Sequence, residues 1–275
     1  MSAGLADQRI GFIGCGAMAR ALCGGLIAGG FPATQINGSD PSDSQRSDFT
    51  AALDVETTAD NAELVAVSDI IVLCTKPGVV IDMLRNLPTQ AQAQTKLFIS
   101  IAAGIQIKSL ESAIGSGSRI IRVMPNTPAL IGEGVSVLCP NQACTEADRV
   151  AANSLFRSVG ITWVAPEEAM MDAVTALSGS GPGYIFLLLE ALGEAGLKQG
   201  LPKEAAEQLA FQTVLGAARL ALESEASPAE LRAHVTSPGG TTLAGLNHLE
   251  KAQFREAIHG AVEAATRRSR ELGED

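Results

Sequence analysis

The first half of the chain alternates short apolar runs with longer stretches in which apolar residues recur at helical spacing. The apolar runs predict strands at 9–13, 34–40, 69–77, 95–104, 119–128 and 134–140. Helical stretches lie between them, for example at 60–68 and 77–87. Near-continuous apolar strands that alternate with helices are typical of a doubly wound sheet with helices on both faces. The fold class predicted for this half is therefore α/β.

The second half carries no comparable run of strand patterns and is rich in alanine. Helices are predicted at about 182–198, 202–223, 227–234, 241–250 and 251–271. We place the domain boundary after residue 163, which gives domains 1–163 and 164–275. Because the apolar stripes of these helices are wide and contain many small residues, we expect the all-α domain to pack against a second copy of itself.

A glycine-rich turn follows the first predicted strand. Gly14, Gly16 and Ala19 match the pattern G-x-G-x-x-G/A, and the same turn opens a predicted helix. In such a turn the first glycine allows the tight bend and the second lets the backbone approach a pyrophosphate, which faces the helix N-terminus. A single glycine triplet has low specificity, but this one begins a repeated β/α pattern. We therefore predict a Rossmann-like, dinucleotide-binding domain.

The end of the second predicted strand bears on the choice of dinucleotide. Asp40 lies 24 residues beyond the second glycine of the motif, near the position of an acid that accepts from the adenosine ribose and favours NAD. It could equally begin an Asp-Pro turn. Nearby side chains could instead cradle a 2′-phosphate: Ser39, Ser42, Ser44 and Arg46. NADPH and NADH both remain open.

Composition narrows the range of partners and compartments. Of the 275 residues 46% are hydrophobic, which is enough for a core, and the formal net charge of −10 argues against nucleic acid or an anionic membrane as the main partner. The five cysteines show no metal-type spacing, so we expect reduced thiols and no metal site. Neither a secretory leader nor a long uncharged span is visible, and we expect a cytoplasmic protein.

One break in the helical pattern of the second half contains residues that could bind an anion. In the sequence SPGGTT, Gly239 and Gly240 can turn backbone N–H groups inward, and Thr241 and Thr242 begin a helix whose positive dipole end faces the same way. Such a nest holds a carboxylate without a lysine, which suits an acidic protein. The hydroxyl of Thr242 would be left for a ring nitrogen. The alternative is an ordinary Pro-Gly-Gly turn with a threonine cap.

No general acid or base stands out from the pattern. The three histidines, His234, His248 and His259, lie outside any nucleophile, metal or triad motif, and Lys76 could equally be the solvated charge of a loop. A reaction that hardly needs a proton donor fits best. Reduction of a C=N bond is such a reaction, because a cyclic imine is basic enough to be protonated by solvent.

The segment LRAHVTSPGGTTLAGLNHLE at 231–250 resembles the signature of the pyrroline-5-carboxylate reductases. Ordered matches extend along nearly the whole chain: GFIGCGAMA at 11–19, KPG at 76–78, SIAAG at 100–104, RVMPNTPAL at 122–130, ALSGSGPGY at 176–184 and GLP at 200–202. The resemblance implies reduction of 1-pyrroline-5-carboxylate to L-proline with NADPH or NADH, the last step of proline biosynthesis. It also implies a Rossmann domain followed by a helical dimerisation domain, and assembly into a ring of dimers.

The resemblance also implies roles for individual residues. The substrate would contact Glu168, Glu225, Ser237, Gly240, Thr241 and Thr242, and Thr242 would act catalytically by hydrogen-bonding the ring nitrogen. The coenzyme would contact Gly14, Cys15, Gly16, Ala17, Met18, Ser39, Asp40, Asn61, Thr75, Lys76, Pro77, Ala102, Ala103, Gly104 and Asn126. Asp40 departs from the serine that relatives often show there, which weakens an inherited preference for NADPH. The alternative functions are reduction of another small imino or hydroxy acid, or sensing of a dinucleotide without catalysis.

Overall fold

The computed structural model describes residues 4–87 and 95–274. The chain divides into two compact units, a first unit of Met1–Ser180 with Ala265–Asp275 and a helical unit of Gly181–Ala264. The expected boundary was after residue 163. The compact units divide later because the segment after the sheet still packs on it: Met171 is fully buried beside Val137 and Cys139.

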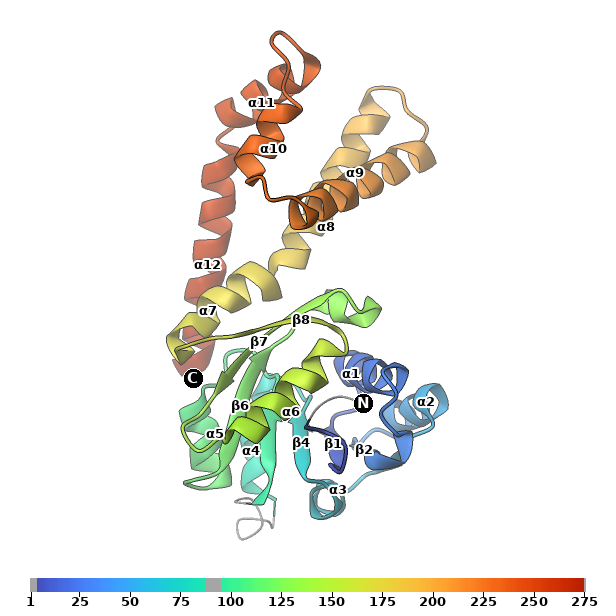
Figure 1. The fold of residues 1–275 in the computed structure, drawn as a ribbon, viewed down its shortest axis with the longest axis vertical. Coiled ribbons are helices and arrows are strands. Elements are labelled where there is room, and N and C mark those ends of the chain that lie inside the picture. Colours follow the sequence, from blue (N-terminus) through green and yellow to red (C-terminus); the bar gives the residue numbers. More distant parts are fainter. Residues whose placement is uncertain (1–3, 88–94, 275) are drawn as a thin grey trace. The chain divides into compact units, whose positions relative to one another are not determined.

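Within the described residues, the first unit contains an eight-stranded sheet in the order β3-β2-β1-β4-β5-β6-β7-β8 (Figure 1). The strands are β1 (Ile10–Ile13), β2 (Ile36–Ser39), β3 (Glu56–Thr58), β4 (Ile70–Leu73), β5 (Leu97–Ser100), β6 (Arg119–Met124), β7 (Gly134–Pro140) and β8 (Gly160–Val164). Neighbouring strands are parallel except β6 and β7, which are antiparallel. The six predicted strands are confirmed, whereas β3 and β8 were not among them.

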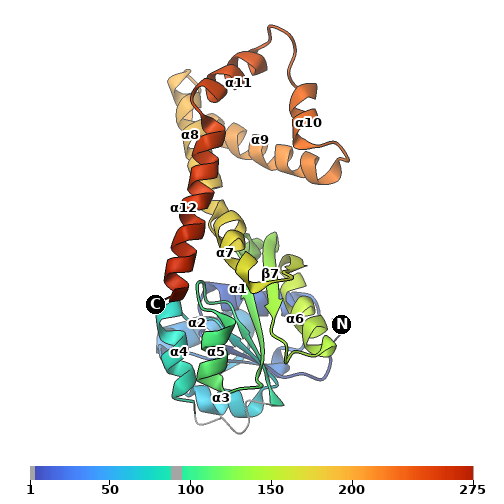
Figure 2. The ribbon, with the colours of Figure 1, turned by 90° about the vertical axis from the view of Figure 1, so that its left-hand side faces the viewer.

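Helices cover both faces of this sheet (Figure 2). One face packs against α1 (Ala17–Ala28), α2 (Asp43–Leu53) and α6 (Glu146–Arg157), and the other against α3 (Asn61–Val67), α4 (Pro77–Arg85) and α5 (Ile107–Ile114). β1 and β4 contribute buried side chains to both clusters. A strand that is buried on both faces must be apolar throughout, and this explains the continuous apolar runs in the sequence.

The strand order places a topological switch point between β1 and β4. From β1 the chain continues to β2 and β3 on one side, and from β4 it continues to β5 and β6 on the other. In doubly wound sheets the ligand crevice lies outside the carboxyl ends of the strands at this point. A ligand is therefore expected beside the turns that follow β1, β2, β4 and β5.

The segment after the sheet is helical, as the sequence predicts. A 3₁₀ turn (Glu168–Met170), α7 (Met171–Val174) and a π-helix (Thr175–Gly179) lead to α8 (Gly181–Lys198), α9 (Lys203–Glu223), α10 (Pro228–His234), α11 (Thr241–Lys251) and α12 (Phe254–Glu274). Between α11 and α12 the backbone of Gln253 adopts a φ of 56°, which ends one helix before the next begins. Among the described residues, no helix is long and apolar enough to cross a membrane.

Candidate functional site

The glycine-rich turn after β1 lies at the switch point. Gly14 adopts a φ of +98°, and its N–H donates to the carbonyl of Ser39 at 2.7 Å. A Cβ at this position would lie 2.8 Å from the carbonyl oxygen of Cys74, which follows β4. Both the conformation and the space therefore require glycine at residue 14.

The second glycine faces open space. Gly16 is the N-cap of α1, and a Cβ built on it would meet no protein atom within 4 Å. Because glycine has no side chain to cap the helix, the first N–H groups of α1, including those of Ala17 and Met18, are free to bind an anion. Burial, reinforced by the carboxylate of Asp40, raises the pKa of Cys15 to about 12, so a neutral thiol lies beside this anion cradle.

The end of β2 is tied to the same turn. The carboxylate of Asp40 accepts the N–H of Cys15 at 3.0 Å and the N–H of Ser42 at 2.9 Å. The hydroxyl of Ser39 donates to the side-chain oxygen of Asn61 at 2.7 Å. Four of the residues expected to contact the coenzyme thus form two hydrogen-bonded pairs at the switch point, Cys15 with Asp40 and Ser39 with Asn61.

The turns after β4 and β5 lie at the same carboxyl edge of the sheet as the glycine-rich turn. The hydroxyl of Thr75 is buried and has no hydrogen-bond partner among the described residues. Buried polar groups are normally hydrogen-bonded, so a bound ligand could supply this partner. Lys76 and Pro77 begin α4 and are exposed. Ala102 is buried, and Ala103 and Gly104 line a cleft of about 810 Å³ that also includes Pro77. The buried hydroxyl and the open glycine together fit a dinucleotide.

Asn126 has a well-defined structural role. It is buried, its amide nitrogen donates to the carbonyl of Ser178 at 3.1 Å, and its oxygen accepts the N–H of Val135 at 2.8 Å. The side chain therefore links the turn after β6 to the π-helix. The family resemblance implies that Asn126 contacts the coenzyme, and that contact stays a prediction beside the structural role shown by these two hydrogen bonds.

Glu168 is held by a cation that the sequence analysis did not single out. One carboxylate oxygen accepts from the Arg122 guanidinium at 2.8 Å and from the N–H of Ile107, at the start of α5, also at 2.8 Å. The side chain of Arg122 is only 5% exposed, between the buried apolar residues Ile121 and Val123 of strand β6. An arginine flanked by apolar residues inside a predicted strand was the available signal, because a buried cation requires a partner.

The predicted carboxylate nest lies in the helical unit, between α10 and α11. Gly239 has a φ of +71°, and the N–H of Gly240 donates to the carbonyl of Ser237 at 3.0 Å. Gly240 is the N-cap of α11, so no side chain caps the helix, and Thr241 and Thr242 in its first turn are exposed. We refer to residues 237–242 as the hydroxyl loop. A carboxylate nest formed by this loop and the uncapped N-terminus of α11 stays a prediction.

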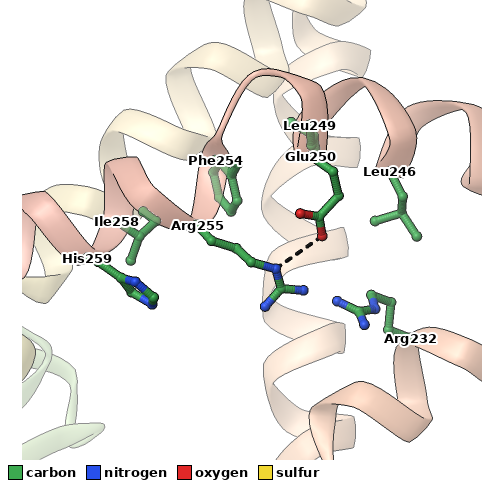
Figure 3. Close-up of a pocket in the computed structure, with 8 residues that line it drawn as sticks. All are labelled: Arg232, Leu246, Leu249, Glu250, Phe254, Arg255, Ile258 and His259. Atoms are coloured by element: carbon green, nitrogen blue, oxygen red, sulfur yellow. Dashed lines mark hydrogen bonds and ion pairs between the residues drawn. The ribbon is translucent and has the colours of Figure 1, made fainter.

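Two further features of the helical unit, an acidic residue and a pocket, lie outside residues 237–242. Glu225, the second predicted acidic position, is exposed in the bend between α9 and α10. A pocket of about 330 Å³ lies among α10, α11 and α12, where Nε of Arg255 is 3.1 Å from a carboxylate oxygen of Glu250 (Figure 3). Its remaining lining residues are Arg232, Leu246, Leu249, Phe254, Ile258 and His259. None of these eight residues was assigned a role from the sequence.

Fold and site define the class of protein: a dinucleotide-binding α/β protein with a glycine-rich turn at the switch point and a helical second part. A family model described as pyrroline-5-carboxylate reductase dimerisation matches residues 168–272. A second model, described as NADP oxidoreductase, coenzyme F420-dependent, matches residues 9–104. Both matches agree with the order of parts found in the structure.

Full-length relatives narrow the class. The chain is 44% identical to pyrroline-5-carboxylate reductase of Pseudomonas aeruginosa over 98% of both chains, and 43% identical to that of Arabidopsis thaliana over 97% of this chain and 96% of the relative. A pyrroline-5-carboxylate reductase structure from Coxiella burnetii superposes with a TM-score of 0.90 at 41% identity, covering 96% of this chain and 98% of that one. A Plasmodium falciparum pyrroline carboxylate reductase with NADP bound gives 0.87 at 35% identity, covering 98% and 99%.

The chain therefore belongs to the pyrroline-5-carboxylate reductase family, and it is an NAD(P)-dependent oxidoreductase. The family predicted from the sequence is confirmed, as is the fold class. The roles of individual residues at the switch point and in the hydroxyl loop rest on their geometry and on the resemblance.

Proposed function

We propose that this protein reduces the C=N bond of 1-pyrroline-5-carboxylate with NADPH or NADH and releases L-proline, the last step of proline biosynthesis. The observation that carries the proposal is the near-full-length identity to named pyrroline-5-carboxylate reductases, 44% over 98% of both chains in the Pseudomonas relative. The open glycine-rich turn would bind the coenzyme, and the hydroxyl loop would bind the substrate. The direct test is consumption of each coenzyme in the presence of 1-pyrroline-5-carboxylate, and no consumption of either would refute the proposal.

The switch point would hold the coenzyme, which supplies a hydride when bound. Gly16 and the N-terminus of α1 would bind the pyrophosphate, because the backbone there is open and carries free N–H groups. The buried hydroxyl of Thr75 would gain the hydrogen-bond partner that it otherwise lacks. The remaining proposed contacts are Gly14, Cys15, Ala17, Met18, Ser39, Asp40, Asn61, Lys76, Pro77, Ala102, Ala103, Gly104 and Asn126.

The hydroxyl loop would bind the substrate. N–H groups at the start of α11, together with the hydroxyls of Ser237 and Thr241, would hold the carboxylate, and Gly240 keeps the approach free of a side chain. This arrangement suits a chain with a net charge of −10, which offers no long-range attraction for an anion and must rely on donors at close range. Glu168 and Glu225 are kept as proposed acidic positions near the substrate, on the resemblance alone.

The chemistry demands little of the protein beyond orientation. Solvent protonates the cyclic imine, hydride adds to the imine carbon, and the π electrons of the C=N bond become the lone pair of the amine, which keeps its proton. The hydroxyl of Thr242 would hydrogen-bond the ring nitrogen and fix the face of the ring that receives hydride. The absence of a positioned histidine from the predicted site residues is consistent with such a reaction.

Thr242→Ala tests this assignment. We expect kcat to fall about ten- to a hundredfold, the worth of one hydrogen bond to a charged group. Coenzyme affinity should stay unchanged, because Thr242 is not among the proposed coenzyme contacts. Thr242→Ser keeps the hydroxyl and should restore most of the turnover. An unaltered kcat in the alanine variant would refute the role of Thr242.

Assembly and location follow as further parts of the proposal. The dimerisation model covers residues 168–272 and supports self-association through the helical unit; assembly of such dimers into a ring is our proposal beyond it. The mass of the particle in solution tests both. All five cysteines are free thiols, which supports a reducing compartment such as the cytoplasm. The acidic net charge favours a small molecule over nucleic acid or an anionic membrane as the partner.

A further inference from the structure

The carboxylate of Asp40 is fixed at the end of β2 by two backbone groups. Its Oδ2 accepts the N–H of Cys15 at 3.0 Å, and its Oδ1 accepts the N–H of Ser42 at 2.9 Å. The first bond ties the acid to the glycine-rich turn, and the second ties it to the N-cap of α2. Each carboxylate oxygen retains a further lone pair, so the group stays an acceptor after both bonds are made. Asp40 is thus a positioned acceptor beside the proposed pyrophosphate cradle.

The cations near Asp40 are already engaged. Arg46 donates from one guanidinium nitrogen to the carbonyl of Asp40 at 2.6 Å and from the other to the carboxylate of Asp43. Its side chain is only 19% exposed, whereas that of Asp43 is 90% exposed. Arg20 donates to the side-chain oxygen of Gln45 at 3.4 Å. A phosphate that approaches the end of β2 would therefore meet the carboxylates of Asp40 and Asp43, with the guanidinium of Arg46 already paired.

Resting on the proposed function, we infer that Asp40 makes this enzyme select NADH over NADPH, with Asp43 reinforcing the choice. A ribose 2′-hydroxyl can donate to a fixed carboxylate, whereas a 2′-phosphate is itself an anion and an acceptor and is repelled by it. Arg46, the cation best placed to offset that repulsion, is occupied by Asp43. The serine residues around the N-cap of α2 offer hydroxyls but no compensating charge.

Coenzyme binding without substrate provides the test. NADH and NADPH are titrated separately into the full-length protein, and binding is followed by the fluorescence of the reduced nicotinamide. We expect NADH to bind more tightly by about ten- to a hundredfold, the range of one hydrogen bond to a charged group. Equal affinities, or tighter binding of NADPH, would overturn the inference.

Two variants separate the parts played by the acids. Asp40→Ser should weaken NADH binding and strengthen NADPH binding, reversing or abolishing the preference. Because this variant also loses a tether of the glycine-rich turn, Asp43→Asn gives a second measurement: it frees Arg46 and should tighten NADPH binding alone. Asp48→Asn, the same charge change at an exposed position of α2, is the matched control and should leave the ratio unchanged. An unaltered ratio in both Asp40→Ser and Asp43→Asn would overturn the inference.

Turnover is measured in parallel to keep this inference distinct from the proposed reaction. A preferential NADH complex without reduction of 1-pyrroline-5-carboxylate by either coenzyme would refute the reaction and still support the role of Asp40. Turnover with equal preference for both coenzymes would support the reaction and overturn the role of Asp40.

Discussion

The two units of this chain differ in where their large apolar side chains lie. In the first unit, both faces of the sheet are covered by buried clusters that include Phe12, Phe98 and Phe156. In the helical unit, whose residues 181–264 are all described, the buried apolar side chains are those of Ala206 and Ala210 alone. Large side chains there remain open: Phe186 is 59% exposed and Leu222 is 83% exposed.

A single chain therefore forms the core of the first unit, whereas large apolar side chains of the helical unit stay exposed. A single copy buries enough apolar surface to specify the α/β unit, whereas the helices of the second unit present apolar faces without partners. Exposed apolar surface of this extent marks an interface between proteins. The matched dimerisation model spans these helices and supports self-association of the chain.

The largest expected effect comes from a charge on an exposed apolar face of the helical unit. Leu215 lies on α9 and is 52% exposed. Leu215→Asp would bury a carboxylate in each copy, and its desolvation costs several kcal/mol, so we expect self-association to weaken by about a hundredfold or more. Light scattering after size exclusion would show single subunits. Ser47→Asp, on an exposed part of α2, should remain associated; unaltered association of Leu215→Asp would exclude α9 from the interface.

The next prediction concerns the self-contained unit and uses its two motif glycines as a matched pair. Gly14→Ala forces a methyl group against the carbonyl of Cys74 at a φ of +98°, so we expect a loss of about 1–3 kcal/mol in the free energy of unfolding as well as loss of coenzyme binding. Gly16→Ala meets no protein atom within 4 Å, so its unfolding should change by less than about 0.5 kcal/mol.

Coenzyme titration distinguishes the two glycines further. In Gly16→Ala the added methyl group fills the space proposed for the pyrophosphate, so affinity should fall although the fold is intact. Thermal unfolding and fluorescence titration of both variants provide the measurements. If Gly16→Ala bound the coenzyme like the parent protein, the proposed position of the pyrophosphate would be wrong.

The sequence predicts those elements whose own residues show an apolar run, a helical spacing of apolar residues or a glycine motif. The strands with apolar runs were found because they are buried on both faces, and the glycine-rich turn because its conformation requires glycine. β3 was missed because Glu56–Thr58 has three polar residues and derives its strand conformation from pairing with β2. β8 was missed as well; it pairs along one side with β7, and its Ile161 and Trp163 are exposed.

Site geometry is less accessible to the sequence, because it depends on partners distant along the chain. The acid at residue 40 was noted as a ribose acceptor or a turn starter, but its bond to Cys15 depends on the pairing of β1 with β2. The amide of Asn126 is satisfied by a carbonyl 52 residues away. Such contacts follow from topology, which local spacing does not encode.

The last prediction concerns stability and separates the two roles of Glu168. In the structure it accepts from Arg122 and from the start of α5, whereas the family resemblance places it near the substrate. Glu168→Ala leaves the buried guanidinium of Arg122 without its partner, so we expect the free energy of unfolding to fall by about 1–3 kcal/mol. Glu167→Ala, at the exposed neighbouring position, is the control and should leave stability unchanged.

The two roles predict different measurements for the same variant. If Glu168 supports the fold of the first unit, denaturant unfolding shifts to lower concentration, Glu168→Gln recovers part of the loss through its remaining acceptor oxygen, and KM for 1-pyrroline-5-carboxylate changes little. If it contacts the substrate, KM rises while unfolding is unaltered. The contacts in the structure favour the first result, because the carboxylate oxygen that accepts from Arg122 also accepts a backbone N–H. An increase in KM alone would show that the contact with Arg122 adds little stability and that Glu168 acts on the substrate.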